Sequence, residues 1–244
     1  MSSRALAATV RRILQQLRAD PRTVALIVVV PALLLTLLYF VYDGGPLFNR
    51  IALTMLGILP MLVMFLITSV AMLRERTSGT LERLWTTPLH RADLLAGYGI
   101  SFALAAVVQS VVLVAVSVWG LGVTTAGPIA WVLLVAAASA IVGVATGLLA
   151  SAFARTEFQA VQFMPLVIGP QIYLCGLLVP HSSMPRALQL SSDILPMTYA
   201  VRALSAIRDQ AAPAGDVLRN VLVLVLFGLG ALLLGALSMP RRTR

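Results

Sequence analysis

The sequence predicts an all-α integral membrane domain with six transmembrane helices and with both termini on the cytoplasmic side. The 244 residues are 59% hydrophobic and 11% charged, with a mean hydropathy of +0.95. A soluble domain of this composition would expose large apolar patches. The apolar segments follow one another with short links, so a single domain over residues 1–244 is expected.

Charge-free runs predict where the chain crosses the membrane, because a spanning helix needs about 20 apolar residues. The predicted spans are 24–42, 51–73, 94–121, 129–153, 158–179 and 217–237. No residue between Asp93 and Arg155 is charged, and the glycine- and threonine-rich stretch 120–128 predicts the turn between two spans there. The first run is too long for a signal peptide and lacks a small-residue cleavage site after it.

The basic residues predict the orientation of the spans, because translocation of cationic flanks is disfavoured. All eighteen are arginine, and with both termini inside, thirteen of them lie in cytoplasmic segments. The others lie mostly in one long outer loop, whose charges count less. The arginines flank the spans, so anionic membrane lipid is their expected partner, and their dispersal argues against nucleic acid.

Residues 2–20 predict an amphipathic helix at the membrane interface. Its apolar residues share about a third of the helical circumference, and they are Leu6, Val10, Ile13, Leu14 and Leu17. Two roles remain open, an anchor on the inner leaflet and a mechanical link between the first span and a cytoplasmic partner.

The inner loop 74–93 predicts a short helix that docks onto another protein. Gly79 permits a turn, Glu82 suits a first helical turn, and Pro88 ends the helix. One apolar face at helical spacing is formed by Leu81, Leu84 and Trp85. A helix this short does not fold alone, which favours docking into a groove. The alternative is a solvated loop in which Trp85 is an interfacial residue.

Two motifs carry a resemblance to a known family. Residues 75–84, ERTSGTLERL, followed by Thr87 and Pro88, resemble the cytoplasmic-loop signature of ABC-2 type transporter permeases. The loop after the fifth span, with GLLVP at 176–180 and LPMTYAVRAL at 195–204, is similar to the corresponding family segment. Both motifs occur in the right loops and order, so the resemblance covers essentially the whole chain.

The resemblance implies a half-transporter. Two permease chains, identical or paralogous, would pair, and each would contact a separate ABC ATPase subunit through the first inner loop, the coupling helix. The coupling residues that it implies, with Trp85 added from its apolar face, are Glu75, Gly79, Thr80, Leu81, Glu82, Leu84, Trp85 and Pro88. Residues 2–20 would be the family's interfacial helix, and 184–208, within the outer segment 180–216, its re-entrant hairpin.

No catalytic, cofactor or metal site is expected in this chain, so it is not predicted to be an enzyme. A nucleotide-hydrolysing P-loop needs a lysine, and the chain has none, so ATP and Mg²⁺ are expected in the partner subunit. His90 and His181 are predicted on opposite sides of the membrane, and Cys175 is predicted to be a small buried residue. No carboxylate lies within a span, which argues against a proton-driven carrier.

An uncharged interior with methionine and glutamine suits amphiphilic or apolar cargo better than ions. The candidate pathway residues are Met61, Met64, Phe65, Thr68, Gln162, Met164 and Gln171. For the polar ones, the alternative and more common role is hydrogen bonding to a neighbouring helix. Proline-bounded short segments in the outer loop indicate a re-entrant cap or, alternatively, a solvated loop. The candidate gate residues are Pro180, Pro196, Tyr199 and Arg202, with predicted ion pairs Arg202–Asp209 and Arg208–Asp216.

Together these features predict a multi-pass permease of a prokaryotic plasma membrane. It would export a drug-like or lipid-like molecule, as in multidrug efflux and antibiotic resistance, by alternating access at a dimer interface. Two alternatives stay open: a polysaccharide or glycolipid cargo within the same family, and a membrane scaffold or sensor that moves nothing.

Overall fold

The computed structural model describes residues 3–77 and 91–238, and in this part of the chain all regular structure is helical. This confirms the all-α prediction. The elements are α1 (Ser3–Ala19), α2 (Pro21–Val41), α3 (Pro46–Thr77), α5 (Arg91–Ala115), a π-helical turn η1 (Val116–Gly120), α6 (Ile129–Phe153), α7 (Glu157–Leu174), a 3₁₀ turn η2 (His181–Ser183), α8 (Arg186–Ser192), α9 (Pro196–Asp209) and α10 (Ala214–Ser238).

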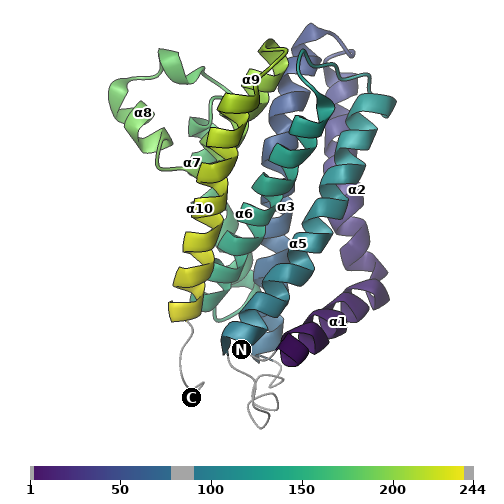
Figure 1. The fold of residues 1–244 in the computed structure, drawn as a ribbon, viewed down its shortest axis with the longest axis vertical. Coiled ribbons are helices and arrows are strands. Elements are labelled where there is room, and N and C mark those ends of the chain that lie inside the picture. The colour runs from purple at the N-terminus through teal and green to yellow at the C-terminus, as the bar shows by residue number, and fades with distance from the viewer. Residues whose placement is uncertain (1–2, 78–90, 239–244) are drawn as a thin grey trace.

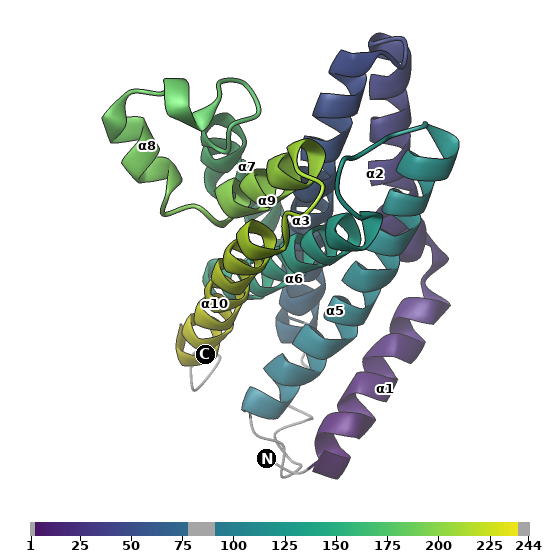
Figure 2. The same cartoon turned by 45° about the horizontal axis from the view of Figure 1, so that its top comes forward.

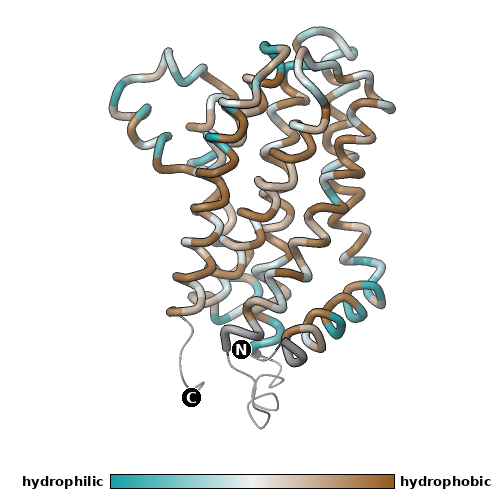
Figure 3. The backbone as a smooth tube through the Cα atoms, in the orientation of Figure 1, coloured by the Kyte–Doolittle hydropathy of each residue, from teal (hydrophilic) through white to brown (hydrophobic). Residues whose placement is uncertain are grey.

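The long helices α2, α3, α5, α6 and α10 run roughly side by side and form a bundle (Figure 1). The start of α1 and the end of α10 lie at the same end of this bundle, which we call the base; the opposite end is the top (Figure 1). α1 lies at the base and is tilted relative to the long helices (Figure 1), whereas α8 lies on the opposite flank of the bundle (Figure 2). Apolar backbone segments fill the middle of the bundle and polar ones gather towards its ends (Figure 3).

Among the described residues, five helices are long and apolar enough to cross a membrane: α2, α3, α5 together with η1, α6 and α10. The sixth predicted span, 158–179, corresponds to α7, which ends earlier, at Leu174, and is not one of the five. Glutamines and two internal prolines, Pro165 and Pro170, lower its hydropathy. The sixth crossing therefore stays a prediction.

Two helix boundaries show how the chain departs from a simple count of apolar residues. α3 has 32 residues and extends beyond the predicted 51–73 at both ends, because polar residues continue the helix outside an apolar core.

Between α1 and α2 the chain turns at Asp20, whose carboxylate accepts hydrogen bonds from the Thr23 backbone N–H (3.2 Å) and hydroxyl (2.6 Å). These bonds lower the pKa of Asp20, and Pro21 fits the first helical turn that they cap.

The core of the bundle is the close packing of α3 against α6. Gly147 of α6 faces the α3 backbone so closely that an added Cβ would lie 2.5 Å from the carbonyl oxygen of Phe65. Gly143, one turn earlier, makes a still closer approach to the carbonyl of Met61. Ser139 adds a hydrogen bond to the carbonyl of Gly57 at 2.6 Å. Small residues one turn apart let helix backbones approach in this way, and they hold α3 and α6 together as a unit.

Candidate functional site

The last turn of α3 lies at the base, directly before residues 78–90, and joins α3 to α1. Arg12 of α1 donates a hydrogen bond to Glu75 of α3, with 2.7 Å between Nη2 and Oε1. The Glu75 side chain is only 9% exposed, and Tyr98 of α5 also forms a side-chain hydrogen bond to it. A buried carboxylate needs such partners, because desolvation penalises its charge. Glu75 thus connects three helices.

The same turn also contacts α7 and α6. Arg74 donates two hydrogen bonds, 2.8 and 3.0 Å long, to the two carboxylate oxygens of Glu157 at the start of α7. This contact lowers the pKa of Glu157, although both side chains are more than half exposed. Arg76 donates to the backbone carbonyl of Ser151 in the last turn of α6. α1, α6 and α7 therefore all meet the turn that precedes the predicted coupling segment.

Of the predicted coupling residues, the structure describes Glu75 alone. Gly79, Thr80, Leu81, Glu82, Leu84, Trp85 and Pro88 lie outside the described residues. Glu75 was predicted as part of the contact with the ATPase. In the structure its carboxylate faces inward, towards α1 and α5, which makes it a link between that segment and the bundle.

α1 is packed against the bundle over part of its apolar face. Ile13 is 3% exposed, and an added Cβ on Gly97 of α5 would lie 2.6 Å from Cγ2 of Thr9. With the Arg12–Glu75 pair, these contacts fix one side of α1 to α5 and α3. Leu17 is partly buried against the same core, whereas Leu6, Val10 and Leu14 line an open hollow instead.

Four predicted pathway residues lie inside the single chain. Met61, Met64, Phe65 and Thr68 on α3 are each 0% exposed. Met61 and Phe65 face the glycines of α6, and Met64 packs with a cluster that includes residues of α5 and α6. In this conformation their environment is the core of one subunit, which does not fit a pathway between two subunits.

The other three pathway candidates lie on α7 and differ among themselves. Gln162 is exposed and Met164 is half-buried against the core. Gln171 is 3% exposed and has a structural role, because it donates to the carbonyl of Val167 (2.8 Å) and accepts from the backbone N–H of Met197 at the start of α9 (3.3 Å). These hydrogen bonds explain why a polar side chain is buried at this position.

The top of the bundle carries the predicted gate residues. Tyr199 donates from its hydroxyl to the backbone carbonyl of Asp193 at 2.7 Å, and Arg202 contacts the Asp193 carboxylate at 2.5 Å. The Arg202 guanidinium also lies 5.5 Å from the centre of the Tyr199 ring. Pro196 is buried as the first residue of α9, whereas Pro180 is exposed before η2. Three of the four predicted gate residues thus lie around the start of α9.

Both predicted ion pairs in this region are wrong. Arg202 pairs with Asp193, because the turn before α9 brings that carboxylate back over the first turns of the helix. Arg208 pairs with its neighbour Asp209 at 2.7 Å, and this contact lowers the pKa of Asp209. Asp216 instead accepts a hydrogen bond from Gln210 at 3.2 Å.

Sequence reasoning missed a set of contacts that hold the top together. Asn49, at the start of α3, donates from its side chain to the Thr124 carbonyl (3.0 Å) and accepts from the Thr124 backbone N–H (2.8 Å). Gly127 donates to the carbonyl of Ile207 in α9 at 2.9 Å. The loop between η1 and α6 is thereby fixed to α3 and α9. The only sequence signal is the pair Gly127-Pro128, which marks a turn but not its partners.

The described residues contain no group of three His, Cys, Asp or Glu side chains placed to hold a metal ion.

Comparison with known proteins places these features in a family context. Residues 4–208 match the family described as ABC-2 type transporter. The chain is 33% identical over 138 residues to ABC transporter G family member 20 of Dictyostelium discoideum (57% of this chain, 19% of the relative). It is 29% identical over 156 residues to the linearmycin resistance permease protein LnrN of Bacillus subtilis (64% and 40%). It is 28% identical over 134 residues to the probable multidrug ABC transporter permease YbhR of Escherichia coli (55% and 36%). The chain thus spans less than half the length of each of these relatives.

Proposed function

Because this chain belongs to the ABC-2 type transporter family, we propose that it is the membrane-spanning permease subunit of an ATP-driven exporter. Two such chains, identical or paralogous, pair in a prokaryotic plasma membrane with the base on the cytoplasmic side. ATP and Mg²⁺ bind to a separate ATPase subunit, which contacts the permease through residues 74–93.

The observation that carries this proposal is the convergence of α1, α6 and α7 on the last turn of α3. A segment that receives force from a partner needs rigid contacts to the elements that it moves. The pair Arg12–Glu75 supplies a partly buried contact of this kind at 2.7 Å, one turn before the predicted coupling helix.

The cargo in this proposal is a drug-like or lipid-like amphiphile. Support comes from the relatives named as a multidrug permease and a linearmycin resistance permease. The pathway is proposed to run along α7, where the second chain would pack. Large apolar side chains are exposed there, including Phe158 at 70% and Leu166 at 68%, beside the exposed Gln162. The four buried residues of α3 are not part of this narrower proposal.

Two measurements test the proposal. The chain is expressed with its candidate ATPase partner, and recruitment of the ATPase to membranes is measured; an ATPase that stays soluble overturns the transporter assignment. ATPase activity of the complex is then measured with drugs, lipids and glycolipids. Stimulation by amphiphilic drugs or lipids supports the cargo class, whereas stimulation by glycans alone replaces it with polysaccharide or glycolipid export.

The coupling segment is tested with substitutions of two of its residues. We expect Glu82→Ala and Trp85→Ala to reduce substrate-stimulated ATPase activity while membrane insertion stays intact. Arg155→Gln, at an exposed position in the link between α6 and α7, is the control for loss of charge at the base. Unchanged stimulation in both variants would remove the coupling role from this segment.

A further inference from the structure

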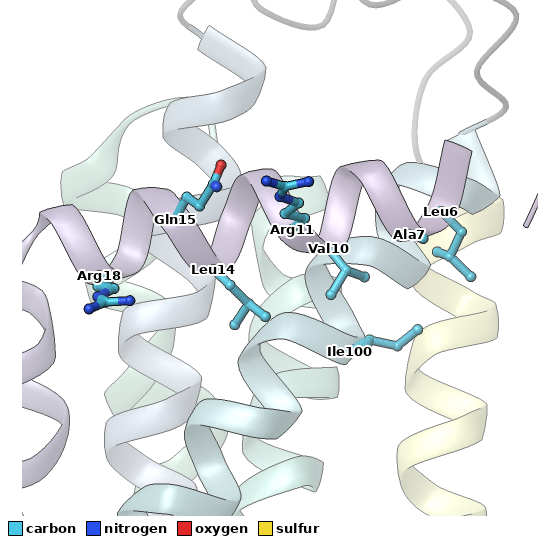
Figure 4. Close-up of a pocket in the computed structure, with 8 residues that line it drawn as sticks. All are labelled: Leu6, Ala7, Val10, Arg11, Leu14, Gln15, Arg18 and Ile100. Carbon is cyan, nitrogen blue, oxygen red and sulfur yellow. The ribbon is translucent and has the colours of Figure 1, made fainter. Parts of the chain in front are cut away.

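The apolar face of α1 is divided between two environments. Ile13 is buried against the bundle, but Leu6, Val10 and Leu14 point into a hollow between α1 and α5 (Figure 4). In the same view Arg11 and Gln15 extend from the opposite side of α1, and Ile100 of α5 lies across the hollow. The volume of this hollow is about 550 Å³, and its walls are almost wholly apolar.

A second hollow continues the first along the bundle. It measures about 410 Å³ and lies between α2 and α5, and it shares Leu14 and Arg18 with the first. Its walls include residues one turn apart on each of the two helices, and they are Val24, Val28, Leu104 and Val108. Together the two hollows form one apolar groove, which we call the α1 groove, that begins under α1 and follows the α2–α5 seam away from the base.

The rim of the α1 groove is cationic. Arg11 and Arg18 both border it and are exposed, and no ion pair of either is formed within the part of the chain that the structure describes. The two residues are seven apart, so their Cα atoms lie about 10 Å apart along α1. In Figure 4 the Arg18 side chain extends on the groove side, whereas the long, exposed Arg11 side chain extends from the other side of α1 and reaches the groove by rotation about its side-chain bonds. The nearby carboxylate of Asp20 already accepts two hydrogen bonds from Thr23. Guanidinium groups in this position suit a phosphate, which they can bind through paired hydrogen bonds.

We propose that the α1 groove binds an anionic phospholipid from the leaflet at the base. Its phosphate lies at Arg11 and Arg18, and an acyl chain lies between Val28 and Val108. This arrangement matches the two ends of a phospholipid. The arginines lie on the interfacial helix, where a headgroup would be, and the apolar α1 groove leads from there towards the middle of the bundle, as an acyl chain would. A bound lipid fills the side of α1 that the protein leaves uncovered and so supports the position of α1 on Glu75.

The site is distinct from the proposed transport pathway. It lies between α1, α2 and α5, whereas the pathway is proposed along α7 on the opposite flank of the bundle (Figure 2). A second permease chain would be an alternative occupant of the groove, but a cationic rim with no acidic residue among the described residues that line it fits a phosphate better.

Lipid binding is measured on the whole chain without ATP or an ATPase, so its result is independent of the transport assignment. The protein is exchanged into micelles with phosphatidylglycerol or phosphatidylcholine of matched acyl chains, and retained lipid is counted by native mass spectrometry. We expect at least tenfold preferential retention of phosphatidylglycerol. The double variant Arg11→Gln/Arg18→Gln should lose that preference, whereas Arg155→Gln/Arg219→Gln, which removes two exposed arginines elsewhere, should keep it.

The apolar part of the site is tested by filling it. Val108→Trp, in the groove, should reduce retention of both lipids several-fold, whereas Val225→Trp, at a similarly exposed position on α10, should not. Equal retention of the two lipids by the unsubstituted protein, or equal loss in the groove and control variants, overturns the proposal. Crosslinking of a Val108→Cys variant to a second copy of the chain also overturns it, because it identifies that copy as the occupant.

Discussion

The pair Arg12–Glu75 gives the sharpest test of how α1 is joined to the bundle. In the variant Arg12→Gln, a carboxylate that is 9% exposed loses its cation but keeps its hydrogen bond from Tyr98. Removing one partner of a fully buried pair costs about 3–5 kcal/mol. Because Arg12 is 30% exposed and Tyr98 remains, we expect a loss of about 2–3 kcal/mol in the free energy of unfolding.

The reverse substitution should be milder. In Glu75→Gln the group left behind is a guanidinium that reaches water, so we expect a loss of about 1 kcal/mol. The double variant should resemble Glu75→Gln alone, which gives a coupling energy of about 2–3 kcal/mol in a double-mutant cycle. The assay is equilibrium or thermal unfolding of all four proteins in the same lipid nanodiscs, with Arg155→Gln as the control for loss of an exposed arginine.

Additive effects of the two substitutions, or equal losses below about 0.5 kcal/mol in both single variants, would refute this reasoning. The carboxylate would then be solvated in the membrane protein, and α1 would not be joined to α3 through it. The proposed route from α1 to the coupling segment would lose its main support.

Three further predictions follow from packing and charge. Gly147→Ala should lower the unfolding free energy by about 1–3 kcal/mol, because the added Cβ would meet the α3 backbone. The control is Gly230→Ala, where an added Cβ would have no such neighbour within 4 Å. In the same unfolding assay this variant should be neutral or slightly stabilising. Arg208 lowers the folded-state pKa of Asp209 below 3.8. The ion pair therefore contributes stability above pH 3.8, and this stability is lost as the pH falls through the folded-state pKa. In a profile of melting temperature against pH, Asp209→Asn should reduce the decrease at acid pH, and an unchanged decrease would contradict this prediction. Neither polar atom of the 1% exposed Gln109 has a hydrogen-bond partner among the described residues, so Gln109→Leu should raise stability by about 1–2 kcal/mol; a lower melting temperature would show that the amide has a partner in the membrane.

Helices were predictable from the sequence because the signal for them is local. Charge-free runs of about 20 residues reflect the thickness of the hydrocarbon core, and α6 occupies 129–153, as the run there predicts. The short helix α8 begins directly after Pro185, and α9 begins at Pro196; each proline lacks a backbone N–H donor. α7 was harder to place, since its glutamines and prolines give it a weaker apolar signal.

Contacts between distant segments were not predictable in the same way. Arg12 and Glu75 are 63 positions apart, and nothing in the sequence around either residue marks them as partners. For Arg202 the prediction used an acid that follows it along the chain, but the true partner, Asp193, lies before the helix begins. The spacing Gly143-x-x-x-Gly147 is a local signal for close helix packing that was present and overlooked; which helix it meets depends on the tertiary fold.

The contacts of α3 connect the two ends of the molecule. At the base, the last turn of α3 forms ion pairs with Arg12 and Glu157. In its middle, α3 packs on the glycines of α6. Nearer the top, Gly57 contacts α9, where a Cβ added to Gly57 would lie 2.9 Å from Cδ1 of Leu204. Close packing of this kind leaves little room for α3 to slide alone, so a displacement at the base carries α6 and α9 with it. α7 also packs on α3 at the base, through Leu73, Ala160 and Phe163 beside the exposed ion pair, but its helix differs in being interrupted by two prolines. In the proposed transport cycle we therefore expect α7 to bend at its prolines while the α3–α6 unit stays together, and the proposed pathway follows the helix that bends.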